Sequence, residues 1–249
     1  MYIIRQGSCY LGVYLFMTMK KLLAPSLIAS LLVGCSSSIP TPNLDQFTEY
    51  TGGQSMGDAT SLYWYTERLS FPYTAADYVS AGDYGWYKSD YRWEDGEIRE
   101  LIREGQQLKD NQGLVPYRIH VRFSKDGEAI YQQYRLDGKV LPLKADKIAW
   151  LKQEALTIPT RTKEQSSTGV RLIQGYWDGS SFDTCSGQSY EHVEFNETLP
   201  SFVINRLSSV DSYAAFLGTT QSKKVIVNQL LMLAEDSHDC IERPGLIEE

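Results

Sequence analysis

The chain of 249 residues carries 24 Lys and Arg against 31 Asp and Glu, which gives a formal net charge of −7. Its 42% hydrophobic and 22% charged residues are typical of a globular protein and exclude wholesale disorder. The acidic balance argues against a nucleic-acid partner, because phosphate binding needs clustered Lys and Arg side chains. The 17 Tyr, 8 Phe and 5 Trp residues favour a β-dominated fold.

Residues 19–34 have the layout of a secretory signal peptide, in which the cationic start Met19-Lys20-Lys21 precedes the apolar run 22–33. This run is too short to span a bilayer and has the length of a signal-peptide hydrophobic region. Residues 1–18 stand before this complete signal. We therefore expect either a mis-assigned start, with Met17 or Met19 as the true first residue, or an extended n-region.

The end of this signal, Leu31-Leu-Val-Gly-Cys35, resembles the lipobox of bacterial lipoproteins. In that family the cysteine is acylated and becomes the first mature residue. The resemblance implies a lipid anchor of the palmitate type on Cys35, followed by a spacer over residues 35–43. An Asp after the cysteine is the usual inner-membrane retention signal in that family. Ser36 stands there instead, which implies an outer-membrane protein that faces the periplasm and has the membrane as a partner.

Residues 44–165 are expected to form an antiparallel β unit. Residues 117–123 alternate between apolar and polar side chains, as a half-buried strand does. Asp-Gly pairs, which supply the positive φ of tight hairpins, separate strand-like runs at 95–96, 126–127, 137–138 and 178–179. Further predicted strands span residues 61–69, 84–93, 98–102 and 130–136.

One helix is predicted over residues 144–158, where an apolar stripe recurs at helical spacing. Pro159 is expected to interrupt or kink it. The polar stretch 160–168 is then the candidate domain boundary.

Residues 169–249 are expected to form a second β unit. Strands are predicted over 170–177, 181–185, 211–217 and 225–233, with a short helix over 202–207. The fold class predicted for the whole chain is mainly β (α+β), an antiparallel meander followed by a helix and a small barrel of OB type. Cys185 and Cys240 are expected to form a disulfide, because an exported protein meets an oxidising compartment.

Several stretches are similar to the YjaH-like family of proteobacterial lipoproteins, a domain of unknown function. They are Tyr91-Arg-Trp93, residues 119–127, residues 175–187 and Asp239-Cys240, within a likeness that covers roughly residues 84–243. The resemblance implies an exported lipoprotein without an assigned activity, and it lends no catalytic residues.

Gly53-Gln-Ser55-Met-Gly57 matches the G-x-S-x-G motif of hydrolase nucleophiles. That motif works on a strained turn between a strand and a helix, above a parallel sheet. Here a strand is expected to follow, and the chain shows no alternation of strands and helices. A glycine-rich loop is the favoured interpretation, and a serine hydrolase at Ser55 is the second alternative to the binding function.

Two histidines stand among acidic residues. His192 is flanked by Glu191 and Glu194, and His238 lies in the acidic stretch 235–239. Neither group has the spacing of a known metal site, so solvated acidic surface is the favoured interpretation and no metal or other cofactor is expected.

Arg118, His120 and Arg122 form a cationic row on one face of a predicted strand. This row is a candidate anion-binding strip, although such a row is more often the solvated side of a half-buried sheet.

The leading functional expectation is a non-enzymatic binding or interaction module of the cell envelope. The alternative is a carrier of lipid or another apolar ligand, held in a cavity beneath the aromatic side chains of the meander. The aromatic residues that motivate it are Tyr63, Trp64, Trp86 and Trp93.

Overall fold

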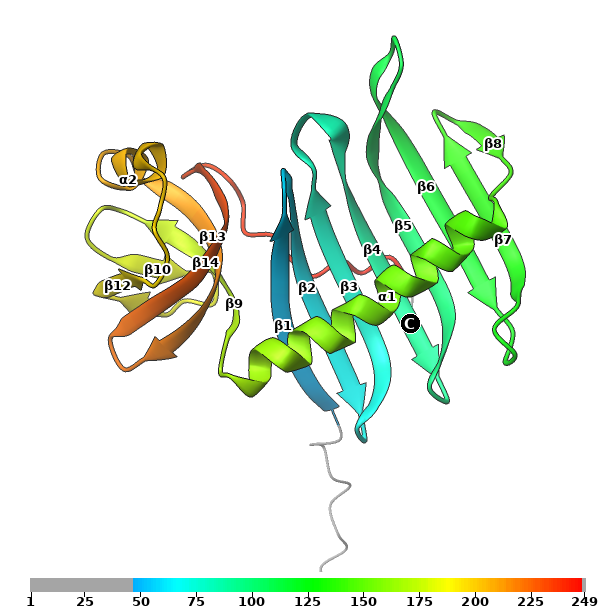
Figure 1. Cartoon of the computed structure of the whole chain (residues 1–249), viewed down its shortest axis with the longest axis horizontal. Coiled ribbons are helices and arrows are strands. Elements are labelled where there is room, and N and C mark those ends of the chain that lie inside the picture. Colours follow the sequence, from blue (N-terminus) through cyan, green and yellow to red (C-terminus); the bar gives the residue numbers. More distant parts are fainter. Residues whose placement is uncertain (1–46, 248–249) are drawn as a thin grey trace, which may run out of the picture. The chain divides into compact units, whose positions relative to one another are not determined.

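The computed structural model describes residues 47–247 (Figure 1), so the expected signal peptide, Cys35 and the spacer lie outside the described residues. The first part of the chain contains β1 (Phe47–Met56), β2 (Ala59–Arg68), β3 (Phe71–Ser80), the 3₁₀ turn η2 (Gly82–Tyr84), β4 (Gly85–Glu94), β5 (Glu97–Lys109), β6 (Gly113–Phe123), β7 (Ala129–Leu136) and β8 (Lys139–Leu141). The second part contains α1 (Ala145–Ser167), β9 (Arg171–Trp177), β10 (Phe182–Thr184), β11 (Ser189–Tyr190), β12 (His192–Phe195), α2 (Ser201–Leu207), β13 (Ser212–Gln221) and β14 (Lys224–Glu235).

The first eight strands form one antiparallel sheet in sequence order, β1 to β8. The predicted meander is therefore confirmed, and the four Asp-Gly pairs all stand in turns between consecutive strands. Asp95 and Asp137 adopt positive φ values of 55° and 51°, with positive φ also at the glycines that follow them. The sequence analysis did not predict β1, which contains two glycines, or β3, which contains Pro72.

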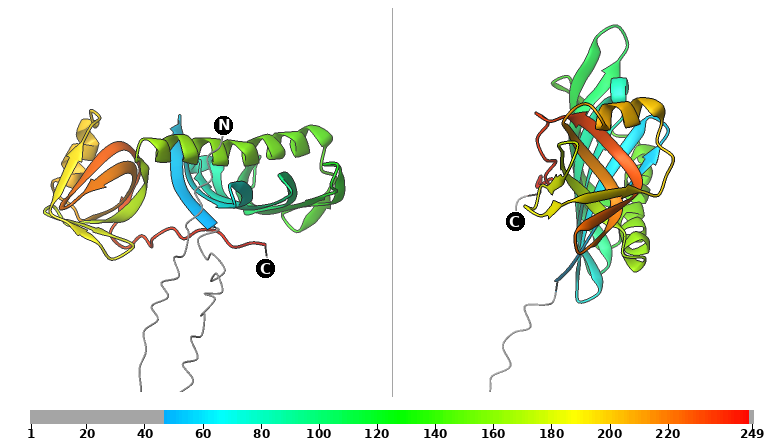
Figure 2. Two further views of the ribbon diagram at one scale, coloured as in Figure 1. Left: turned by 90° about the horizontal axis from the view of Figure 1, so that it is seen from below. Right: turned by 90° about the vertical axis from the view of Figure 1, so that its left-hand side faces the viewer.

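Helix α1 covers one face of this sheet, and an extended carboxy-terminal segment runs along the other face (Figure 2, left). The helix buries Leu151, Ala155 and Ile158 against apolar side chains of β2 to β6. Residues 117–123 alternate as predicted, with Ile119 and Val121 in this core. The core beneath α1 therefore lies on one face of the sheet.

The prediction that the helix ends at 158 is wrong, because α1 continues through Pro159 to Ser167. Proline removes one helical hydrogen bond, at a cost of about 3 kcal/mol. Tertiary contacts on the far side of the proline offset this cost. Gln165 accepts a hydrogen bond from the Gly53 amide at 3.1 Å and donates one to the Gly53 carbonyl at 2.8 Å. The stretch 160–168 therefore lies largely within a packed helix and is no linker.

Strands β9 to β14 form a second sheet, in the order β11-β10-β9-β13-β14-β12. It is nearly closed and barrel-like, as predicted, and the short helix α2 interrupts its strands. All pairings are antiparallel except that of β12 with β14. A further core cluster joins the two sheets, since Leu62 of β2 packs with Leu172, Tyr213 and Leu231.

The carboxy-terminal segment is fixed to the face of the first sheet that α1 leaves uncovered. Arg243 donates hydrogen bonds to the hydroxyls of Thr66 and Thr74, at 2.9 and 2.6 Å. The carboxylate of Asp90 accepts hydrogen bonds from the amides of Leu246 and Ile247, at 3.0 and 3.1 Å.

The disulfide between Cys185 and Cys240 is confirmed. It joins the residue after β10 to the segment that follows β14, so it connects the start of the second sheet to the chain that crosses the first.

We expect the disulfide to stabilise the folded protein by about 4 kcal/mol, because it closes a loop with a sequence separation of 55 residues in the unfolded chain. Urea unfolding of the oxidised protein and of a Cys185→Ser, Cys240→Ser variant measures this difference. Equal unfolding midpoints would show that the cross-link contributes nothing.

Candidate functional site

A buried arginine lies at the centre of the interface between the first sheet and α1. Arg103 of β5 is 1% exposed. Its guanidinium donates to the hydroxyls of Ser89 at 2.8 Å and Tyr91 at 2.9 Å. It also forms ion pairs with Glu154 of α1 at 2.8 Å and Asp77 of β3 at 3.9 Å. Three strands and the helix therefore meet at one side chain.

The ring of Tyr87 completes this cluster, because the guanidinium carbon of Arg103 lies 3.9 Å from the ring centroid. Burial raises the pKa of Asp77 above its ordinary value, and the charge of Arg103 acts in the opposite direction. The same two causes act on Glu154, whose pKa is also raised. Because one buried guanidinium contacts carboxylates on both the sheet and α1, the cluster is suited to fixing the helix on the sheet.

A cavity of about 340 Å³ opens beside the first turn of α1. Its lining combines apolar side chains and tyrosines with two lysines: Gln107, Tyr117, Ile119, Tyr134, Pro142, Leu143, Lys144 and Lys147. Its volume lies in the range of small-molecule sites, which are apolar with a few polar groups. An apolar body with an anionic head has the chemistry that this lining would accept.

Lys147 connects this cavity to the buried cluster. Burial lowers its pKa below the ordinary value, and the charge of Arg103 acts in the same direction. Its ammonium lies 3.6 Å from the ring centroid of Trp150. Among the described residues neither Lys144 nor Lys147 has a carboxylate partner at ion-pair distance. An anion bound here would offset the cost of placing Lys147 in a partly buried position.

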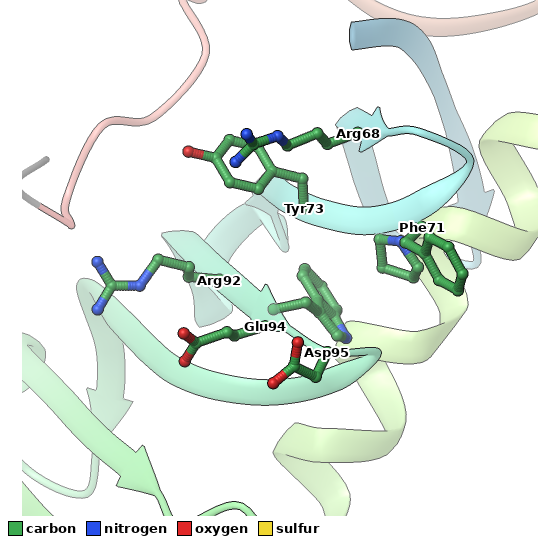
Figure 3. A pocket seen from close by; sticks show the side chains of 8 residues that line it. Arg68, Phe71, Tyr73, Arg92, Glu94 and Asp95 are labelled. Atoms are coloured by element: carbon green, nitrogen blue, oxygen red, sulfur yellow. The ribbon is translucent and has the colours of Figure 1, made fainter. Parts of the chain in front are cut away.

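A wider groove lies on the opposite face of the sheet (Figure 3). One part, of about 750 Å³, is lined by Arg68, residues 71–73 and residues 92–95. A second part, of about 650 Å³, reaches the carboxy-terminal segment and shares Tyr73 and Arg92 with the first. Its charges are mixed, because Glu94 and Asp95 lie across from Arg68 in Figure 3. The groove shows no preference for one sign of charge.

The predicted anion-binding strip lies on the face of the sheet that α1 leaves uncovered, beside two glutamates of β5. Arg118 pairs with Glu104 at 2.7 Å, and His120 lies 2.8 Å from Glu100. Arg122 lies 3.9 Å from the carboxylate of Glu100. The structure therefore brings the three residues together as predicted, but they share only Glu100 and Glu104, which also pair with Arg92 and Lys88. Anion binding at this strip stays a prediction.

Ser55 lies near the end of β1, in a hairpin with β2. The hydrolase motif needs a strand-to-helix turn, which this hairpin does not provide. Both glycines of the motif have structural roles. A Cβ on Gly53 would lie 2.5 Å from the carbonyl oxygen of Ser61, and Gly57 has a φ of +61° in the turn.

The candidate metal-binding histidines remain apart from further ligands. The neighbours of His192, Glu191 and Glu194, form ion pairs with lysines at the β13–β14 turn. The ring of His238 stacks on Tyr213 at a centroid distance of 4.5 Å. Within residues 47–247 no three His, Cys, Asp or Glu side chains are placed to hold a metal ion. In the same range no helix is long and apolar enough to cross a membrane.

The aromatic residues that suggested a ligand cavity do not share one. Tyr63 and Trp93 are buried in the core beneath α1. Trp64 packs with the cluster that joins the two sheets. Trp86 stacks on Tyr78, on the face of the first sheet that α1 leaves uncovered. The cavity beside α1 is lined by other residues, which the sequence analysis missed. A signal for them was present, since Lys144 and Lys147 stand in the first turn of the predicted helix, on the same side as its apolar stripe.

Replacing the buried arginine should strongly destabilise the fold. We expect Arg103→Met to lower the free energy of unfolding by about 3–5 kcal/mol, because Asp77 and Glu154 would lose their buried counter-charge. Urea unfolding measures the loss. Arg118→Met is the control, since its ion pair is exposed and contributes at most about 1 kcal/mol. Similar losses in both variants would contradict the role given to Arg103.

Comparison with known proteins gives a family but no activity. No curated protein and no solved structure matches the chain significantly. Residues 51–245 match the family model described as "Protein of unknown function (DUF1481)". This match starts within β1 and ends in the carboxy-terminal segment, so it includes both sheets, α1 and the disulfide. The chain belongs to the DUF1481 family.

Proposed function

We propose that this protein is an outer-membrane lipoprotein that acts in the periplasm as a non-enzymatic binding module. The signal-like residues 19–34 and the lipobox-like cysteine at position 35 support the export and the anchor. The Cys185–Cys240 disulfide supports an oxidising compartment, since disulfides persist outside the cytosol.

The cavity beside α1 is the proposed ligand site, and it is the observation that carries the binding function. Ile119, Pro142 and Leu143 offer apolar contact, and Lys144 and Lys147 offer positive charge. The proposed ligand is a small amphipathic anion with an acyl or aromatic body. The second candidate function, a carrier of such a ligand, uses the same cavity and differs only in requiring release to a partner of the envelope.

A serine hydrolase at Ser55 has the weakest support, because the serine lies on a hairpin. Labelling of Ser55 by a fluorophosphonate would revive this alternative.

The cavity predicts saturable binding of laurate, measured by isothermal titration calorimetry. Lys144→Gln and Lys147→Gln should each weaken binding about tenfold, because each removes a charge-assisted contact to the carboxylate. Lys125→Gln, at the β6–β7 turn and outside the cavity lining, is the matched control. Dodecanol, which has the same chain without the charge, should bind all four proteins alike. An unchanged laurate affinity in both lysine variants would refute this site.

The anchor predicts a membrane-bound, acylated protein in the native host. Cys35→Ser should abolish incorporation of labelled palmitate and move the protein to the soluble periplasmic fraction, because no acyl chain would then hold it. Cys185→Ser is the control, since it removes a cysteine that belongs to the disulfide. Unchanged palmitate labelling of the Cys35→Ser variant would exclude this anchor.

A further inference from the structure

The turn between β2 and β3 exposes large apolar side chains. Leu69 is 62% exposed and Phe71 is 67% exposed. Leu69 and Ser70 form the tip of this turn with positive φ values of 52° and 68°. Phe47, at the start of β1, is 48% exposed and lies beside the same turn, because it pairs with Arg68. Three apolar side chains therefore gather at one end of the sheet.

Two amphipathic side chains contact Phe47 in this apolar group. The ring of Phe47 contacts the ring of Tyr73 at a centroid distance of 5.4 Å. The guanidinium carbon of Arg68 lies 5.8 Å from the centroid of Phe47. Figure 3 shows Arg68 and Tyr73 together on one side of the groove, with Phe71 away from them. Single exposed apolar residues are normal, but an apolar group bordered by Arg and Tyr is typical of a membrane interface.

This end of the sheet is the one at which β1 begins, and β1 is the first described element after the proposed anchor in the sequence. Eleven residues, 36–46, separate Cys35 from Phe47. Eleven residues can span at most about 40 Å. The turns of an antiparallel meander alternate between its two ends, so the β5–β6 turn lies at the end opposite to Phe47 and the β2–β3 turn.

We propose that the β2–β3 turn is a membrane-contact site, at which Leu69, Phe71 and Phe47 enter the interface of the phospholipid leaflet that holds the anchor. Arg68 and Tyr73 then lie at the level of the headgroups, where a guanidinium contacts phosphate and a phenol is partly hydrated. The inference rests on the proposed lipid anchor, because a single-turn contact of this size needs a tether to hold it at the surface.

Spin labels on the lipidated protein test the contact. Ser70→Cys places a label on the tip and keeps Leu69 and Phe71, and Gln112→Cys places a control label on the β5–β6 turn. The protein is reconstituted in vesicles of phosphatidylethanolamine and phosphatidylglycerol. The label at position 70 should lose collisions with a water-soluble nickel chelate and gain collisions with oxygen, whereas the label at 112 should behave as in water. Equal accessibility at both positions would overturn the proposal.

A second variant separates this contact from the anchor. Leu69→Ser combined with Phe71→Ser should return the label at position 70 to water-like accessibility, while mass spectrometry still shows the acylated cysteine. An unchanged accessibility in this variant would refute the apolar contact. Protein that carries no acyl group would instead refute the anchor, and with it the proposed function.

Discussion

The position of α1 on the first sheet depends on one buried charge. A guanidinium in a protein interior must be matched by carboxylates and hydrogen-bond acceptors, because an unpaired buried charge costs several kcal/mol. Arg103 meets this requirement only when Asp77, Ser89 and Tyr91 are in register on their strands and Glu154 faces them from α1. The register of β3 to β5 and the rotation of the helix are therefore set together.

This constraint decides where a ligand can bind. Helix α1 fills the middle of the covered face with Leu151, Ala155 and Ile158, so the aromatic residues beneath it form core rather than a cavity. Space remains beside the first turn of the helix, where Lys144 and Lys147 stand next to apolar side chains. On the uncovered face, the arginines of β6 share two glutamates of β5 with Lys88 and Arg92 of β4. The cavity proposed to bind a ligand therefore lies beside the first turn of α1 and not beneath the middle of the helix.

The apolar β2–β3 turn and the cavity lie towards opposite ends of the meander. The β2–β3 turn carries exposed apolar residues at the end where β1 begins, and Gln107 of the cavity lies near the β5–β6 turn at the other end. A protein tethered through residues before β1 would hold its apolar turn towards the bilayer. The cavity would then face the periplasm, where a soluble ligand or a partner could reach it.

The sequence by itself determined the strands with clear alternation, the Asp-Gly turns, the short helix α2 and the disulfide. Each of these depends on local backbone preference or, for the cysteines, on the expected compartment. The length of α1 follows from tertiary contacts. Local preference ends a helix at a proline, but Gln165, which follows Pro159, hydrogen-bonds the backbone of Gly53. The tertiary structure alone decided that Arg103 is buried and that the cavity lies beside Lys147. Those outcomes depend on contacts between side chains of the helix and of strands far apart in the sequence, and a local sequence pattern does not predict such contacts.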